Sequence, residues 1–297
     1  MQTEQPISGS PVTTRQRKSL AALQKLIRQL SRAADERRAQ GRYDLAEPLY
    51  LRALSLAELF CECEDVAALC NNLAVLYKYM GRFDEAERLY RRALPLMEQS
   101  LGPEHSEIAT LYHNLGGLEH ARGRFAAGEP LARRSVEIRE RALGPDHPDV
   151  AADIAALAGI LDGQGKYNES EPLYRRALAI FEREYGPEHY EIAVNLNNLA
   201  ALKHAQGCLD EAERLYRRAL VIKEKLLTAE HPDVAMTLNN LAVLCKAQGR
   251  YPEAEALYRR ALASFERSFG PESLKVITCR NNHATLMRLM ERRANEN

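Results

Sequence analysis

The chain has 297 residues, of which 45% are hydrophobic and 28% are charged, a composition typical of a folded, water-soluble protein. Lysine plus arginine number 41 and aspartate plus glutamate also number 41, so the formal net charge is zero. This balance argues against general binding to nucleic acid or to an anionic membrane, which usually depends on a basic excess. We therefore expect neither as a partner.

The six cysteines have no spacing that indicates a disulfide framework or a zinc site, so we expect free thiols. No apolar run approaches the ~20 residues that a bilayer requires. The polar segment 1–18 lacks the apolar stretch of a signal peptide. These features predict a cytoplasmic protein with a disordered tail at 1–18 and a flexible end at 292–297.

A block of 14 residues recurs along the chain, for example "GRFDEAERLYRRAL" from Gly81 and "GCLDEAERLYRRAL" from Gly207. The first interval between blocks is 40 residues and every later one is 42. Two further units recur between the blocks, a connector such as "LGPDHPDVA" and a segment such as "LNNLA". A fixed period of this length is the sequence signature of a tandem-repeat protein. The blocks begin at Gly41, Gly81, Gly123, Gly165, Gly207 and Gly249.

Each period predicts two helices, which we name helix A and helix B. The segment Leu20–Gln40 takes the place of the first helix A and is expected to cap the array. In later periods helix A runs from the connector to the glycine that ends it, and helix B begins at the aromatic or leucine after that glycine. Ser273 to about Met290 predicts a closing helix. Residues 19–291 thus predict an all-α array of about six helix pairs plus a capping helix.

Four histidines, one per connector, are candidates for metal binding or catalysis. Neighbouring connectors are separated by at least one helix-packing distance, ~8–10 Å, whereas metal ligands lie at about 2 Å. We therefore expect these histidines to close the N-terminus of helix A. The chain has no dinucleotide fingerprint, P-loop, nucleophile elbow or HExxH pair. We predict no enzyme, no catalytic residue, no metal and no cofactor. The histidines are His105, His147, His189 and His231.

The pattern Leu73-Ala74-x-x-Tyr77, Gly81, Phe83, Ala86, Tyr90, Ala93-Leu94 resembles a tetratricopeptide repeat. The 42-residue period, the connector and the "NNLA" segment are similar to the repeats of kinesin light chains and their bacterial relatives. The resemblance implies a right-handed superhelical solenoid whose A helices line a concave groove. In that family the groove holds extended peptides or partner helices, and asparagines at matching places contact the peptide backbone.

Three polar columns are expected to face this groove. A primary amide both donates and accepts, so stacked asparagines can pair with the backbone of an extended chain. A basic column beside them would favour acidic side chains or a C-terminal carboxylate. The first column contains Asn71, Asn197, Asn239 and Asn281, the second Asn72, Asn114, Asn198, Asn240 and Asn282, and the third Lys78, His120, His204, Lys246 and Arg288.

The asparagines could instead brace neighbouring helices. For the first column we favour contact with a ligand, and for the second we weigh bracing and ligand contact evenly. The third full repeat breaks the pattern with Ala155, Ala156 and Asp162. We therefore expect the main peptide site C-terminal to this break and a smaller patch before it. The main site would comprise Asn197, Asn198, His204, Asn239, Asn240, Lys246, Asn281 and Arg288, and the patch Asn71, Asn72 and Lys78.

The function predicted from these observations is a scaffold or adaptor that binds an extended, acidic peptide segment of a protein partner in its groove. One alternative is a regulatory sensor module that changes the shape of its superhelix when a peptide or effector binds. A less favoured alternative is a kinesin-type cargo adaptor. Kinesin light chains carry a long heptad coiled coil, whereas only about twenty helical residues without sustained heptads precede the first glycine here.

Overall fold

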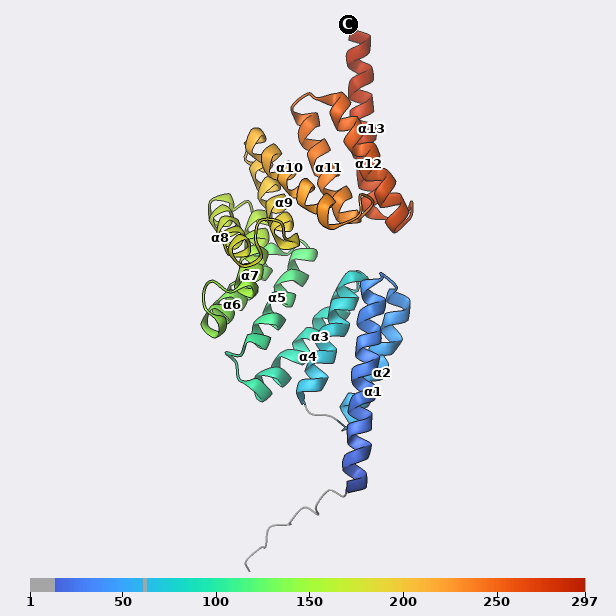
Figure 1. Cartoon of the computed structure of the whole chain (residues 1–297), viewed down its shortest axis with the longest axis vertical. Helices are drawn as coiled ribbons and strands as arrows, with labels where there is room; N and C mark the ends of the chain where they lie inside the picture. Colours follow the sequence, from blue (N-terminus) through green and yellow to red (C-terminus); the bar gives the residue numbers. More distant parts are fainter. Residues whose placement is uncertain (1–13, 61–62, 297) are drawn as a thin grey trace, which may run out of the picture. The chain divides into compact units, whose positions relative to one another are not determined.

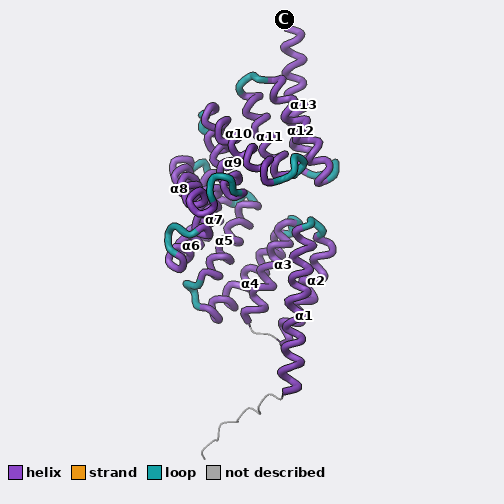
Figure 2. The backbone as a smooth tube through the Cα atoms, in the orientation of Figure 1, coloured by secondary structure: helices purple, strands orange, loops and turns teal. Residues whose placement is uncertain are grey.

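The computed structural model describes residues 14–60 and 63–296, which form α-helices joined by short connections (Figures 1 and 2). Within these ranges there is no strand. The helices are α1 (Thr14–Ala39), α2 (Tyr43–Phe60), α3 (Cys63–Tyr79), α4 (Phe83–Leu101), α5 (Ser106–Ala121), α6 (Phe125–Leu143), α7 (Pro148–Gly163), α8 (Tyr167–Tyr185), α9 (Tyr190–Ala205), α10 (Leu209–Leu226), α11 (Pro232–Ala247), α12 (Tyr251–Phe269) and α13 (Leu274–Glu296).

The chain divides into two compact units, Met1–Arg122 with α1 to α5 and Gly123–Asn297 with α6 to α13. Within each unit, every helix packs against the helices before and after it in the chain. Successive A helices also touch, as α3 and α5 do in the first unit and α7 and α9 do in the second. Such nearest-neighbour packing, in which each pair buries its apolar face on the next, is the arrangement of an α-helical solenoid.

A tyrosine of helix B connects each pair to the next. Tyr174 of α8 is 2% exposed and packs against Ala158 of its own A helix and against Leu199 of the following one. Ala158 is fully buried, because only a small side chain lets the tyrosine ring approach the helix backbone at this point. The period of the sequence is therefore also the period of the packing.

The ends of the A helices follow the connector and glycine signals. The Nδ1 atom of His147 accepts a hydrogen bond from the backbone N–H of Asp149 at 3.1 Å, which satisfies one of the free donors of α7. His105, His189 and His231 cap α5, α9 and α11 in the same way. Gly207 ends α9 with a φ of 79°, a left-handed conformation that suits glycine. The capping role predicted for the four histidines is confirmed.

Both terminal helices are longer than expected. Helix α1 begins at Thr14, inside the segment expected to be a disordered tail, and α13 runs to Glu296 instead of ending near Met290. The structure thus has helix at 14–18 and 292–296, where the sequence predicted a disordered tail and a flexible end. Both stretches are rich in arginine, glutamine, lysine, alanine and glutamate, which favour helix, and neither contains glycine or proline to stop it. The rest of the expected tail, residues 1–13, lies outside the described residues, as does residue 297.

The cysteines at 63, 70, 208, 245 and 279 are free thiols, and Cys61 lies outside the described residues. Across 14–60 and 63–296, no helix has the length and apolarity to cross a membrane.

Candidate functional site

The candidate site comprises polar side chains on the A helices, and we name two sets. The amide ladder is Asn71, Asn72 and Asn114 in the first unit and Asn197, Asn198, Asn239, Asn240, Asn281 and Asn282 in the second. The charged column is Lys78 and His120 in the first unit and Asp162, His204, Lys246 and Arg288 in the second. The ladder residues are half-buried except Asn281, which is exposed.

In the first unit the asparagines hydrogen-bond to one another across repeats. The Nδ2 atom of Asn114 on α5 donates to Oδ1 of Asn71 on α3 at 2.8 Å. Asn71 in turn donates from its Nδ2 to Oδ1 of Asn72 at 3.2 Å. The predicted patch residues Asn71 and Asn72 are thus brought together, and Asn114 joins them. These bonds link two successive A helices, as the bracing interpretation requires.

The second unit repeats this arrangement less completely. Asn240 on α11 donates to Oδ1 of Asn197 on α9 at 3.5 Å, and Asn239 donates to Asn240 at 3.4 Å. Asn198 occupies the same column as Asn240, but Ala155 takes the place of its acceptor on α7, and the side chain of Asn198 makes no hydrogen bond to any described residue. The Oδ1 atom of Asn239 is buried and also lacks a partner within the described part of the chain. The ladder in this unit therefore retains unused hydrogen-bonding capacity.

Lys78 and His120 lie close together in the first unit. The Nζ atom of Lys78 is 3.4 Å from the point where a Cβ on Gly117 would lie, so the glycine leaves room for the ammonium. Burial lowers the pKa of Lys78, and desolvation together with the Lys78 charge lowers the pKa of His120. Lys78 forms no ion pair with any carboxylate in the described residues. A half-buried cation without an anion is the arrangement that a carboxylate ligand would stabilise.

The charged column of the second unit changes sign along the repeats. Asp162 on α7 is half-buried, and burial raises its pKa. His204 on α9 is also half-buried, and burial lowers its pKa. Lys246 on α11 is half-buried. Arg288 on α13 is exposed, and its Nε donates to the carbonyl of Ala284 at 3.3 Å. Lys246 and His204 occupy the same position of their repeats, and Asp162 occupies it on α7.

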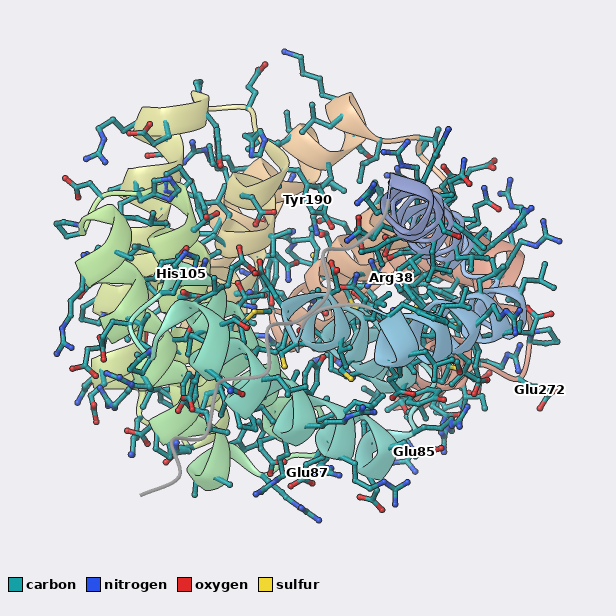
Figure 3. All side chains as sticks on the ribbon, turned by 90° about the horizontal axis from the view of Figure 1, so that it is seen from below. Arg38, Glu85, Glu87, His105, Tyr190 and Glu272 are labelled. Atoms are coloured by element: carbon teal, nitrogen blue, oxygen red, sulfur yellow. The ribbon has the colours of Figure 1, made fainter. Side chains whose placement is uncertain are left out.

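The sequence did not predict a periodic set of hydrogen bonds in which a glutamate of helix B accepts from side chains of the next repeat. The carboxylate of Glu129 on α6 accepts from Lys166 Nζ at 2.7 Å and from Gln164 Nε2 at 2.8 Å, both at the corner between α7 and α8. Glu87, labelled in Figure 3, accepts from Arg122 in the first unit. Arg91, four residues further along the same helix, also donates to Glu87, at 2.9 Å. The recurrence of glutamate at one position of every block was the available signal.

A cavity of about 840 Å³ lies between α6, α7 and α8, with an apolar floor that includes Ile154 and Leu157. The arginines at its rim are paired with glutamates, for example Arg134 with Glu137 at 3.0 Å and Arg176 with Glu140 at 2.7 Å. It therefore offers fewer unpaired charges than the charged column does. Within the described ranges, no group of three or more His, Cys, Asp or Glu side chains is arranged to hold a metal ion.

Repeated helix pairs, histidine-capped A helices and a periodic polar face define a tandem helix-turn-helix solenoid. The chain belongs to the tetratricopeptide repeat family, whose sequence profile matches residues 29–99, 65–127, 107–183, 151–225, 191–267 and 233–294. A comparison with curated protein sequences finds no significant match.

Three solved structures illustrate the likeness. BtubC (BKLC) from P. vanneervenii is 26% identical, with a TM-score of 0.59 over 84% of this chain and 93% of that one. The putative kinesin light chain repeats of Podosopora anserina are also 26% identical, with a TM-score of 0.54 over 67% of this chain and 95% of that one. A Rap protein complexed with Competence and Sporulation Factor is 12% identical, with a TM-score of 0.62 over 94% of this chain and 82% of that one, and it shows the shared fold alone.

Proposed function

We propose that this chain is a non-catalytic protein-interaction scaffold that captures an extended, acidic segment of a partner along the polar face of its A helices. The amide ladder would contact the backbone of the segment, because each asparagine offers both a donor and an acceptor. Lys78 would contact carboxylates of a segment bound to the first unit, and Lys246 those of a segment bound to the second. The family and the resemblance to kinesin-light-chain-type repeats support a binding role of this kind.

The observation that carries the proposal is the contrast between Lys78 and the charged side chains of the B helices. Arg218 is paired with Glu182 at 2.5 Å, and Arg260 with Glu224 at 2.7 Å. Lys78 is half-buried, yet no carboxylate of the described residues compensates its charge. Placing an unpaired cation in a partly desolvated site costs free energy, so such a site favours an anionic ligand.

Affinity capture with substituted groove residues tests the proposal. The immobilised chain and a variant with Asn239→Ala, Asn240→Ala and Lys246→Gln would be compared for the proteins they retain from the source-cell lysate. The expected result is that specific partners disappear with the variant. A segment of each retained partner, made as a labelled peptide, should then bind the wild-type chain at least ten times more tightly than the variant.

Because Asn240 also hydrogen-bonds to Asn197, a second variant separates binding from stability. Asn198→Ala with Lys246→Gln removes two groove side chains that make no side-chain hydrogen bond to described residues. It should keep the unfolding temperature of the wild type and still lose partners. Arg214→Gln, an exposed change on α10, serves as the matched control. Retention of the same partners by all of these variants would contradict a groove-binding scaffold.

A further inference from the structure

The charged column of the second unit runs from one acidic side chain to three basic ones. Its members, Asp162 on α7, His204 on α9, Lys246 on α11 and Arg288 on α13, occupy one position in successive repeats, 42 residues apart. Burial raises the pKa of Asp162, and no cation of the described residues pairs with its carboxylate. The groups that its charge perturbs are the buried hydroxyls of Tyr174 and Tyr216, which are neutral.

The same repeats pair their charges elsewhere. In this unit an arginine of α8, α10 and α12 pairs with a glutamate of the preceding B helix: Arg176 with Glu140, Arg218 with Glu182 and Arg260 with Glu224, all within 2.7 Å. Opposite charges on these neighbouring B helices therefore form ion pairs within the fold. The charged column does not follow this pattern. Asp162 and Lys246 form no ion pair with described residues, which leaves their charges available to a bound partner.

The distance between neighbouring members of the charged column predicts how far apart the charged residues of a bound segment should be. Packed neighbouring helices lie ~8–10 Å apart, and an extended chain rises ~3.3 Å per residue. One repeat thus corresponds to about three residues of an extended segment. Asp162 and Lys246 are separated by two repeats, or about six residues, and Arg288 lies about three residues further.

We propose that the second unit selects an extended segment with charges of both signs, in which a lysine or arginine contacts Asp162 and an aspartate or glutamate about six residues away contacts Lys246. A second acidic residue further along would contact Arg288. The inference rests on the proposed function, and it refines the acidic partner to a bipolar one. Asp162 then acts as a specificity residue that rejects segments that are acidic throughout, because a second carboxylate opposite it would be repelled.

A phage-displayed library of random twelve-residue peptides, panned on the full chain, tests this inference. The expected result is enrichment of peptides with one basic and one acidic residue five to seven positions apart, in either order along the peptide. Panning on Asp162→Asn should lose the enrichment for the basic residue only. Panning on Lys246→Gln should lose the enrichment for the acidic residue only. Asp210→Asn, which changes an exposed carboxylate on α10, is the matched control and should change neither.

A double-mutant cycle tests whether the basic residue of the peptide contacts Asp162. One enriched peptide and its version with the basic residue replaced by methionine would be measured against the wild-type chain and Asp162→Asn. We expect at least a tenfold loss when either charge is removed and little further loss when both are removed. Equal unfolding temperatures for all chains would show that the fold is intact.

The two possible failures differ in their results. Enrichment of purely acidic peptides that depends on Lys246 but is unchanged by Asp162→Asn would overturn the bipolar inference and leave the proposed function standing. Absence of any enriched peptide, or enrichment that none of the groove substitutions affects, would overturn the inference and the proposed function together.

Discussion

The side chains of Asn114 and Asn71 are hydrogen-bonded although 43 positions separate them, with Nδ2 of the first 2.8 Å from Oδ1 of the second. This contact joins α5 to α3 through the residues that sequence reasoning assigned to a ligand-binding face. The asparagines on the polar face of the first unit therefore already use part of their hydrogen-bonding capacity on one another before any partner binds. A ligand would add to this network through the remaining lone pairs and N–H groups of the amides.

Asn114→Ala should lower the free energy of unfolding by about 1 kcal/mol, because the half-buried amide of Asn71 loses its donor. Chemical denaturation of the full chain measures the change. Asn198→Ala is the matched control: this asparagine occupies the same column, but alanine (Ala155) stands where the acceptor would be, and the side chain of Asn198 makes no hydrogen bond to described residues. Its removal should change stability by less than about 0.5 kcal/mol. Equal losses in the two variants would contradict the bracing role of the ladder.

His147→Ala should cost about 1 kcal/mol of stability, because the imidazole caps α7 by accepting from the backbone N–H of Asp149. His147→Asn should keep most of that stability, since asparagine is a preferred capping residue with an acceptor oxygen of similar reach. Urea unfolding of the three chains gives the comparison. A stability that is the same for the alanine and asparagine variants would show that the cap contributes nothing measurable.

Glu129→Gln should remove part of the acid sensitivity of the fold. Hydrogen bonds from Lys166, Gln164 and Arg133 lower the pKa of Glu129 from 4.5 to about 2. A carboxyl group whose pKa is lower in the folded than in the unfolded chain stabilises the fold at any pH above its unfolded-state pKa. This contribution disappears as the pH falls from 4.5 towards 2.

The unfolding temperature, measured from pH 7 to pH 2.5, should therefore be lower for Glu129→Gln than for the wild type at pH 7, and the two values should converge at the acid end. Glu272→Gln provides the control, because Glu272 (labelled in Figure 3) is exposed and forms no ion pair with described residues. A gap between Glu129→Gln and the wild type that stays constant with pH would rule out this carboxylate as a source of acid sensitivity.

Gly163→Ala should destabilise the second unit by roughly 1–3 kcal/mol through overpacking. A Cβ at Gly163 would lie 2.5 Å from Cε1 of the Phe125 ring, a distance that requires the ring or the helix to move. Adding Phe125→Leu to Gly163→Ala should recover much of the loss, and a double-mutant cycle by denaturation measures the coupling. If Gly163→Ala were as stable as the wild type, the ring would be free to shift.

The helices and their ends were predictable because they depend on local signals that recur every 42 residues. Gly207 ends α9 and His147 begins α7 for reasons contained within a few neighbouring positions. The lengths of α1 and α13 were less predictable, since high helix propensity alone extends them and no capping signal marks their outer ends. Which residues form the columns of the candidate site was likewise predictable, because the helical period determines which residues share a face.

The sequence by itself therefore determined the repeat, the fold class and the candidate columns. Tertiary structure alone decided how these columns use their polar groups. Whether Asn114 reaches Asn71, whether Glu129 reaches Lys166, and whether Asp162 has a cation nearby depend on the approach of helices about 40 residues apart in sequence. Hydrogen bonds require donor and acceptor within about 3.5 Å. Small shifts between packed helices can make or break them, and the periodic sequence pattern does not predict such shifts.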